Sequence, residues 1–177
     1  RAGNDPVRIC ETPAGMLNAI GLHNPGVEEF ATEILPGLRE TGATVIINVA
    51  GHSEGDYLEV LRRLRETEGI YGFELNLSCP NVDGGTMFAT DPVLFGRICE
   101  KARAVTDRPL IPKLSPAAGE LAPYAQIAHG AGMDGVTVSN THPAMALDWR
   151  TGRSKLSRPS GGLSGPAVKP LTLYNVH

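Results

Sequence analysis

Short apolar runs alternate with helical patterns along most of this 177-residue chain. Each run is long enough for one β-strand, and strands are predicted at residues 43–49, 70–77, 110–114 and 135–138. Amphipathic spacing and turn residues predict helices at 27–39, 55–68 and 120–131, with a further helix opening at Asp91-Pro92. A strand followed by a helix, repeated several times, is typical of a parallel β-sheet covered by helices.

The composition of individual segments allows further predictions about burial and secondary structure. Residues 70–77 are apolar enough for a strand buried on both faces. Residues 1–26 are rich in turn signals and are predicted to be mainly loop. A last helix is predicted to begin near Gly165-Pro166. Residues 1–26 and this last helix thus lie before and after the repeating strand and helix pattern.

Each predicted strand ends in polar residues, namely Asn48, Asn76 with Cys79, Lys113, and Asn140 with Thr141. A doubly wound sheet usually carries one Gly-rich strand-to-helix turn, whereas a barrel places polar residues at the carboxyl ends of many strands. The predicted fold class is therefore α/β, a (β/α)8 TIM barrel. A complete barrel has about 250 residues. Residues 1–177 are thus predicted to form a single incomplete TIM-barrel domain of about four to five βα units, lacking N-terminal and C-terminal units.

Charge and cysteine content argue against binding of nucleic acid, association with a membrane and a metal site. The net charge of -3 gives no basic footprint for nucleic acid and no polybasic membrane patch. No apolar run approaches the roughly 20 residues that span a bilayer. The three cysteines, at positions 10, 79 and 99, lack metal or disulfide spacing. A reduced, cytoplasmic protein without a metal site is predicted.

Cys79 stands at the tip of the strand 70–77, with the amides of Asn76 and Asn81 close by in sequence. A thiol there is a candidate base for removing a proton from a planar polar ring, because the amides supply hydrogen bonds that hold the ring. The alternative is that Cys79 is an inert buried thiol, as many cysteines are. Lys113 is a candidate to place positive charge beside a flavin ring, or is an ordinary surface lysine.

Asn-Leu-Ser-Cys-Pro-Asn at residues 76–81 resembles the dihydroorotate dehydrogenases, and its Cys is similar to that of the class 1 enzymes. The resemblance implies FMN-dependent oxidation of (S)-dihydroorotate to orotate in de novo pyrimidine (UMP) biosynthesis. It also implies that Cys79 removes a proton from ring carbon 5 while a hydride leaves carbon 6 for FMN. The predicted enzyme is a flavoprotein oxidoreductase that acts on a CH–CH bond.

The resemblance extends along the chain and implies roles for individual residues. Cys79 is implied as the catalytic base. The implied substrate-binding residues are Asn18, Ala19, Ile20, Gly21, Leu22, Asn76, Asn81, Asn140 and Thr141. The implied FMN-binding residues are Asn48, Asn76, Lys113, Ser139 and Gly165. Pro112 departs from the small or β-branched residue usual before the lysine, which weakens the assignment of Lys113.

The loops after Cys79 and after Leu22 look more like class 1B, NAD-linked, catalytic subunits than like fumarate-using class 1A enzymes. This implies a partner subunit that carries FAD and an iron–sulfur cluster, and a homodimer of the full-length chain. One alternative is a dihydropyrimidine (uracil or thymine) dehydrogenase activity, against which Asn81 argues because a His is typical there. Another is a catalytically inert, truncated barrel fragment with exposed strand edges.

Overall fold

A computed structural model describes residues 1–78 and 88–177. The chain divides into two compact units, residues 25–140 and residues 1–24 with 141–177, and each is described by itself. The prediction of a single incomplete barrel domain stays a prediction. Cys79 and Asn81 lie outside the described residues.

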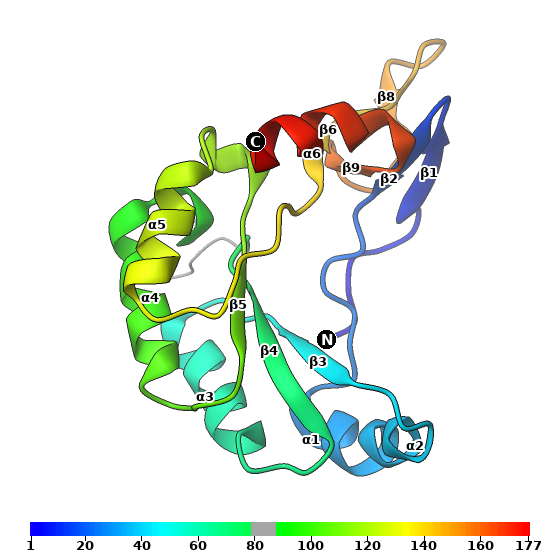
Figure 1. Cartoon of the computed structure of the whole chain (residues 1–177). Coiled ribbons are helices and arrows are strands. Elements are labelled where there is room, and N and C mark those ends of the chain that lie inside the picture. Colours follow the sequence, from blue (N-terminus) through cyan, green and yellow to red (C-terminus); the bar gives the residue numbers. More distant parts are fainter. Residues whose placement is uncertain (79–87) are drawn as a thin grey trace. The chain divides into compact units, whose positions relative to one another are not determined.

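The unit of residues 25–140 contains a three-stranded parallel sheet with helices on one side (Figure 1). Its strands, in spatial order, are β3 (Val45–Val49), β4 (Ile70–Asn76) and β5 (Leu110–Lys113). The helices that follow them are α3 (Glu54–Leu64), α4 (Pro92–Arg103) and α5 (Ala122–Gly130). The shorter helical elements are α1 (Val27–Glu29), η1 (Phe30–Ile34), α2 (Leu35–Glu40), η2 (Phe88–Thr90) and η3 (Pro116–Ala118). The predicted alternation of parallel strands and helices is confirmed.

Helix α4 begins as the sequence predicts. The side chain of Asp91 accepts hydrogen bonds from the backbone N–H groups of Val93 and Leu94, at 2.9 and 3.1 Å. Pro92 is the first helical residue, where its missing N–H group leaves no intrahelical bond unmade. Helix α4 then packs against α3, α5 and β5.

The predicted helix 27–39 is observed as a continuous helical segment with a widened middle turn, η1. There the N–H of Leu35 bonds to the carbonyl of Phe30, five residues back. Pro36, the next residue, has no N–H to donate, which interrupts the regular ladder at this point. Gly42 ends the segment with a φ of 69°, a backbone conformation that favours glycine.

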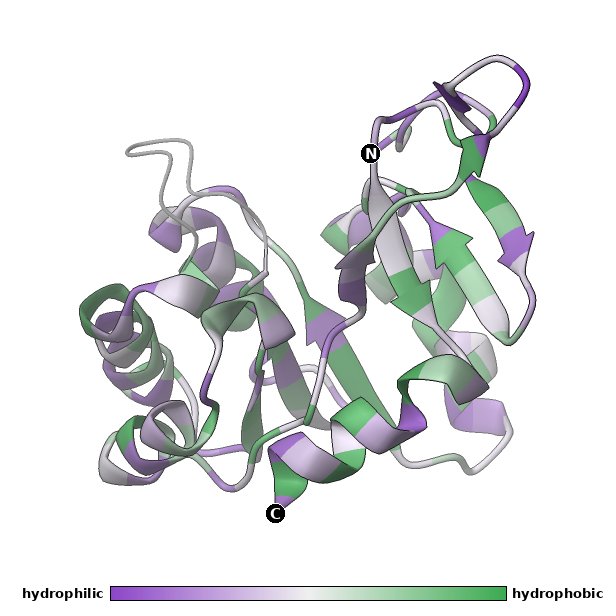
Figure 2. Ribbon diagram, turned by 90° about the horizontal axis from the view of Figure 1, so that it is seen from above, coloured by the Kyte–Doolittle hydropathy of each residue, from purple (hydrophilic) through white to green (hydrophobic). Residues whose placement is uncertain are grey.

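Alternate residues of β4 lie in different environments. Phe73 and Leu75 are fully buried in a core that includes Tyr57 of α3. Glu74 and Asn76 point to the opposite face and are only partly buried. In Figure 2 the strands of this sheet carry hydrophilic bands on a mainly hydrophobic ribbon. The expectation that this strand is buried on both faces is therefore wrong, because its second face carries hydrogen-bonded polar groups.

The segment after α5 runs beside β5, but it is not the regular strand predicted at 135–138. Asp134 and Thr137, three residues apart, donate backbone hydrogen bonds of 3.0 Å to Leu110 and Pro112, which are only two residues apart. The segment thus holds an extra residue relative to its partner, as in a β-bulge. Only an isolated bridge joins Thr137 to β5. The prediction of parallel pairing is correct, and that of a regular strand is wrong.

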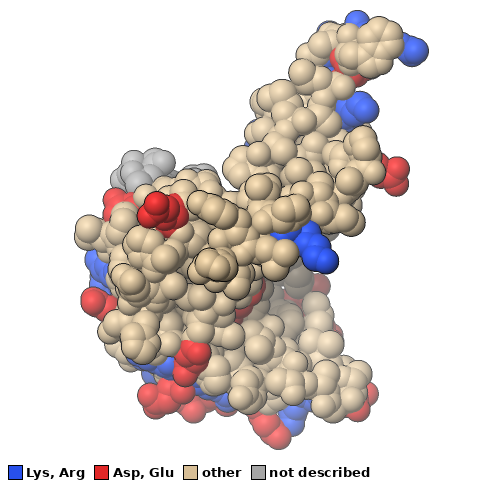
Figure 3. Space-filling view, turned by 45° about the horizontal axis from the view of Figure 1, so that its top comes forward, with Lys and Arg blue, Asp and Glu red and all other residues tan. Residues whose placement is uncertain are grey.

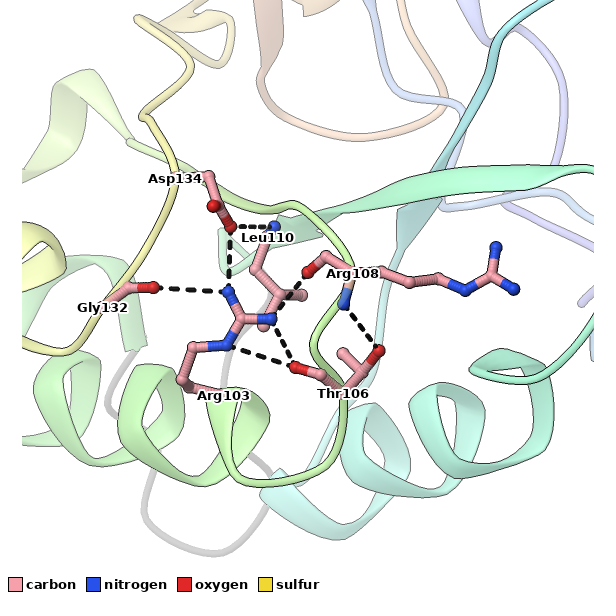
Figure 4. Close-up of polar contacts among 6 residues, drawn as sticks. All are labelled: Arg103, Thr106, Arg108, Leu110, Gly132 and Asp134. Carbon is pink, nitrogen blue, oxygen red and sulfur yellow. Dashed lines mark hydrogen bonds and ion pairs between the residues drawn. The ribbon is translucent and has the colours of Figure 1, made fainter.

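Arg103, near the end of α4, ties several turns of this unit together (Figure 4). Its guanidinium donates to the carbonyls of Thr106, Arg108 and Gly132. It also pairs with Asp134 at 2.9 Å, and the same carboxylate oxygen accepts the N–H of Leu110 at 2.8 Å. The planar, five-donor fork of arginine suits such a cluster of acceptors. The start of β5 is therefore fixed to the helix before it and to the segment after α5.

The unit of residues 1–24 and 141–177 contains a four-stranded antiparallel sheet with the order β1-β2-β9-β6. Its strands are β1 (Ile9–Thr12), β2 (Gly15–Asn18), β6 (His142–Ala144) and β9 (Gly161–Ser164), and β7 (Leu147–Asp148) pairs with β8 (Arg153–Ser154). The helix predicted near Gly165-Pro166 is observed as η4 (Pro166–Val168) and α6 (Lys169–Val176). Residues 1–26 are loop-rich as expected, since β1 and β2 are the regular elements within them. The pairing of β2 with the distant β9 was not predicted, because no local pattern reveals it.

Charged side chains lie on the outer surface of the helices. The carboxylate of Glu54 on α3 pairs with Arg97 of α4 at 2.8 Å, and Glu28 pairs with Arg63 at 2.7 Å. On the face drawn in Figure 3, acidic and basic side chains are interspersed. Within residues 1–78 and 88–177, no helix has the length and apolar character that a membrane crossing requires.

Candidate functional site

The carboxyl ends of β3, β4 and β5 place polar side chains around the carboxylate of Glu74. Asn48 on β3 donates its side-chain amide to Glu74 Oε1 at 2.6 Å. Thr137 donates its hydroxyl to Glu74 Oε2 at 2.6 Å, and Lys113 Nζ on β5 lies 3.5 Å from Oε1. The strand register explains this meeting, because Asn48 is paired with Glu74 in the sheet. Side chains from β3, from β5 and from the segment after α5 thus converge on one carboxylate of β4.

The environment of Glu74 keeps it ionised. Burial raises its pKa, but the hydrogen bonds from Thr137 and Asn48 and the positive charge of Lys113 together lower it by more. The net effect is a pKa below the ordinary value of a glutamate carboxyl. Glu74 is therefore a fixed negative charge and an acceptor only, and it is no candidate for a proton donor.

A second polar group lies two residues further along β4. The amide nitrogen of Asn140 donates to Asn76 Oδ1 at 3.0 Å and to Ser78 Oγ at 2.8 Å. The Asn76 side-chain oxygen is occupied by this bond, so its NH2 group is the end that it offers to a ligand. Asn76 lies beside Lys113 in the sheet register. The predicted Asn48, Asn76, Lys113 and Asn140 thus lie in one polar region of this unit.

Tyr57 supports the site from the core side. Its ring is fully buried and packs edge-on against Phe88, with ring centroids 5.8 Å apart. Its hydroxyl donates to the backbone carbonyl of Asn76 at 2.6 Å. This contact anchors the end of β4, where Asn76 and Ser78 project.

We expect Tyr57→Phe to lower the free energy of unfolding by about 1–2 kcal/mol, because the buried carbonyl of Asn76 loses a donor. Urea denaturation followed by circular dichroism measures the change. Tyr174→Phe is the matched control, since Tyr174 is 82% exposed and its hydroxyl should contribute less than about 0.5 kcal/mol. Equal stability of Tyr57→Phe and wild type would show that this contact does not anchor β4.

Asn18 and residues 19–22, which were also predicted to belong to the site, lie in the other unit. Asn18 ends β2, and its side chain donates to the carbonyl of Gly162 at 3.3 Å. Residues 19–22 follow as a loop held by the backbone of Asn4 and Arg8, through bonds of 2.9 Å to Ile20 and 2.7 Å to Ala19. Gly21 and Leu22 continue this loop with φ angles of 74° and 56°. The predicted substrate loop thus has a defined backbone.

Gly165 and Thr141 also belong to this unit. Gly165 has a φ of 95°, and a Cβ there would lie 2.8 Å from the Cα of Gly15. Only glycine fits such an approach. Thr141 packs against Gly162, where an added Cβ would lie 2.0 Å from the threonine hydroxyl oxygen. That these residues and the Asn76 region form one site stays a prediction.

Not every prediction can be followed in the structure. Cys79 and Asn81 fall outside the described residues, so the base and one substrate amide stay predictions. Ser139 lies between the bulged segment and Asn140, to whose carbonyl its hydroxyl donates at 3.0 Å. Glu74 was missed by sequence reasoning. The signal was present, because Glu74 is charged, lies in an otherwise apolar strand and shares a face with Asn76 two residues later.

The donors and acceptors of residues 25–140 suit a flat heterocycle. Carboxamides present both donor and acceptor groups, which match the alternating edge of a pyrimidine or a flavin ring, and Lys113 adds one positive charge. Among the described residues, no group of histidine, cysteine and acidic side chains has the arrangement of a metal site. The carboxamides and Lys113 are chemically compatible with a bound flavin such as FMN.

Parallel β/α units with polar side chains gathered at the carboxyl ends of the strands are typical of α/β proteins, whose ligand-binding and active sites lie at that end of the sheet. The profile of the dihydroorotate dehydrogenase family matches residues 1–177. The chain belongs to the dihydroorotate dehydrogenase family.

The similar proteins include dihydroorotate dehydrogenases named A (fumarate) and catalytic subunits named B (NAD(+)). A putative dihydroorotate dehydrogenase A (fumarate) of Solibacter usitatus is 44% identical over 176 residues, which cover 99% of this chain and 58% of that protein. Catalytic subunits of dihydroorotate dehydrogenase B (NAD(+)) from Listeria welshimeri and Exiguobacterium sibiricum are each 43% identical over 178 residues, covering all of this chain and 59% and 58% of theirs. The predicted likeness to class 1B catalytic subunits is confirmed. The chain spans less than two thirds of the length of these relatives.

A solved structure, the carboxyl transferase domain of Rhizobium etli pyruvate carboxylase, aligns with a TM-score of 0.49. Its sequence is 14% identical, and the alignment covers 64% of this chain and 19% of that one. A likeness at this level carries no argument about fold or function.

Proposed function

We propose that the protein to which this chain belongs oxidises (S)-dihydroorotate to orotate with FMN, a step in de novo pyrimidine biosynthesis. The observation that carries the proposal is the convergence of Asn48, Asn76, Lys113 and Asn140 from successive β/α units, in a chain that the family profile matches from end to end. A closed TIM barrel is proposed for the whole protein, since this family membership implies it.

In the proposed site, FMN is held by Asn48, Asn76, Lys113, Ser139 and Gly165. Bound FMN supplies a hydride acceptor. Lys113 places positive charge where negative charge develops on a ring, and the amides orient both rings. The proposed substrate-binding residues are Asn18, Ala19, Ile20, Gly21, Leu22, Asn76, Asn81, Asn140 and Thr141.

Cys79 is the proposed base and removes a proton from ring carbon 5 of dihydroorotate. Its place in the sequence supports this role, because it follows Asn76 and Ser78, which lie in the polar region at the end of β4. A buried core thiol would instead be expected among apolar neighbours.

The proposed final electron acceptor is NAD, reached through a partner subunit that carries FAD and an iron–sulfur cluster. The support is the loop resemblance together with the relatives named as NAD-linked catalytic subunits. A homodimer of the full-length chain and a cytoplasmic location are proposed with it.

The test is turnover by the protein expressed from its complete gene. We expect purified protein to show flavin absorbance and to reduce its flavin with (S)-dihydroorotate at least about tenfold faster than with dihydrouracil, because Asn81 replaces the histidine of the pyrimidine-reducing enzymes. Stopped-flow absorbance measures both rates. A preference for dihydrouracil would assign the protein to that other reaction, and colourless protein that does not take up FMN would refute the proposal altogether.

A further inference from the structure

We propose that Glu74 is a positioning residue for the flavin site: its carboxylate sets the orientation of Asn48 and the place of Lys113, the two groups expected to contact FMN from β3 and β5. This inference rests on the proposed function and adds to it a residue that has no role there. Glu74 itself is not expected to contact FMN.

The first support is the direction of the hydrogen bond from Asn48. An ionised carboxylate only accepts, so Asn48 must turn its NH2 group toward Glu74, at 2.6 Å. The carbonyl oxygen of Asn48 then points away from Glu74. Asn48 is thereby fixed as an acceptor, suited to an N–H group of a bound ring. Without the carboxylate, both orientations of this exposed amide would be populated.

The second support is the placement of Lys113. A lysine side chain has several rotatable bonds and loses conformational freedom when it is fixed. Lys113 Nζ lies 3.5 Å from Glu74 Oε1, and both side chains are mostly buried, at 26% and 20% exposed. A partly buried pair is screened by solvent much less than a surface pair. The carboxylate therefore holds the ammonium group close to β4 rather than in solvent.

The third support is that Glu74 is itself held firmly. Thr137 donates to its second oxygen at 2.6 Å, so both carboxylate oxygens are engaged. Its negative charge is also maintained, because these hydrogen bonds and Lys113 outweigh the effect of burial and lower its pKa. A rigid, permanently charged acceptor is what orienting two neighbouring ligand-binding groups requires.

The test compares FMN dissociation constants of apoprotein from the complete gene, in wild type, Glu74→Gln, Lys113→Met and the double variant. We expect Glu74→Gln to weaken FMN binding about tenfold, as for the loss of one charge-assisted hydrogen bond. In the Lys113→Met background, the same substitution should weaken binding only about threefold, because the placement of Lys113 is already lost and only the orientation of Asn48 remains to be disturbed.

A spectroscopic readout separates positioning from stability. At saturating FMN, the absorption band of the bound flavin should shift in Glu74→Gln, because the groups around the ring have moved. A purely structural loss would leave the bound spectrum unchanged. Glu28→Gln is the matched control, since Glu28 also forms an ion pair, with Arg63, but on the surface, and this variant should bind FMN like wild type. If Glu74→Gln fails to fold, Thr137→Val takes its place in the test, because it removes one hydrogen bond that holds the Glu74 carboxylate. We expect it to weaken FMN binding about threefold.

The outcomes are distinguishable. If wild-type protein does not bind FMN, the proposed function fails. If wild type binds FMN, the positioning role is overturned when Glu74→Gln, or Thr137→Val in its place, binds FMN as tightly as wild type with an unshifted band. An effect of Glu74→Gln that is equal with and without Lys113 would overturn the part of the proposal that concerns Lys113.

Discussion

Cys79→Ala is expected to lower the rate of flavin reduction by (S)-dihydroorotate about 10²- to 10⁴-fold, the usual contribution of a general base. The substitution removes the group that is proposed to take the proton from carbon 5. The affinity for FMN should stay within about twofold of wild type, because Cys79 is not among the proposed flavin contacts. Anaerobic stopped-flow absorbance measures the reduction, and FMN titration measures the affinity.

The other two cysteines provide the control. Burial raises the pKa of Cys99 on α4 to about 12, so this thiol stays protonated and does not substitute for a base. Cys10, on β1, is half-buried, and Cys10→Ala should reduce its flavin at the wild-type rate. If Cys79→Ala reacted as fast as Cys10→Ala, Cys79 would not be the base.

The parallel part of the fold was predictable because its signals are local. Apolar runs that alternate with amphipathic helical patterns indicate β3, β4 and β5. Asp91 and Pro92 mark the start of α4, because their capping chemistry is local. The antiparallel unit was not predictable in this way. Its central pairing joins β2 to β9, and short strands with so distant a partner carry too few residues for a periodic pattern.

In the candidate site too, features with a local sequence signal were predictable, and features that depend on contacts between distant segments were not. Polar residues at strand ends identified Asn48, Asn76, Lys113 and Asn140, because the topology of a parallel sheet brings such ends together. The role of Glu74 depends on side-chain geometry across three strands, and its position inside an apolar run concealed it. Sequence also does not reveal the bulge near Thr137, since that depends on how its backbone pairs with β5.

Arg103→Met is expected to lower the free energy of unfolding by about 2–3 kcal/mol, the largest loss expected for a residue outside the site. Methionine keeps much of the apolar stem but removes every donor, so the carbonyls of Thr106, Arg108 and Gly132 and the carboxylate of Asp134 lose a partner (Figure 4). Thr106 is only 7% exposed, so water replaces these bonds poorly.

Arg103→Lys separates charge from geometry. A lysine ammonium keeps the ion pair with Asp134 but does not span acceptors on three separate turns as the guanidinium fork does, so we expect about half of the loss. Arg150→Met is the control, because Arg150 is exposed and lies over the ring of Trp149, 5.1 Å from its centroid. It should cost less than about 0.5 kcal/mol. Urea denaturation of the full-length protein measures all three variants, and a loss for Arg103→Met no greater than that for Arg150→Met would mean that the start of β5 is held by packing alone.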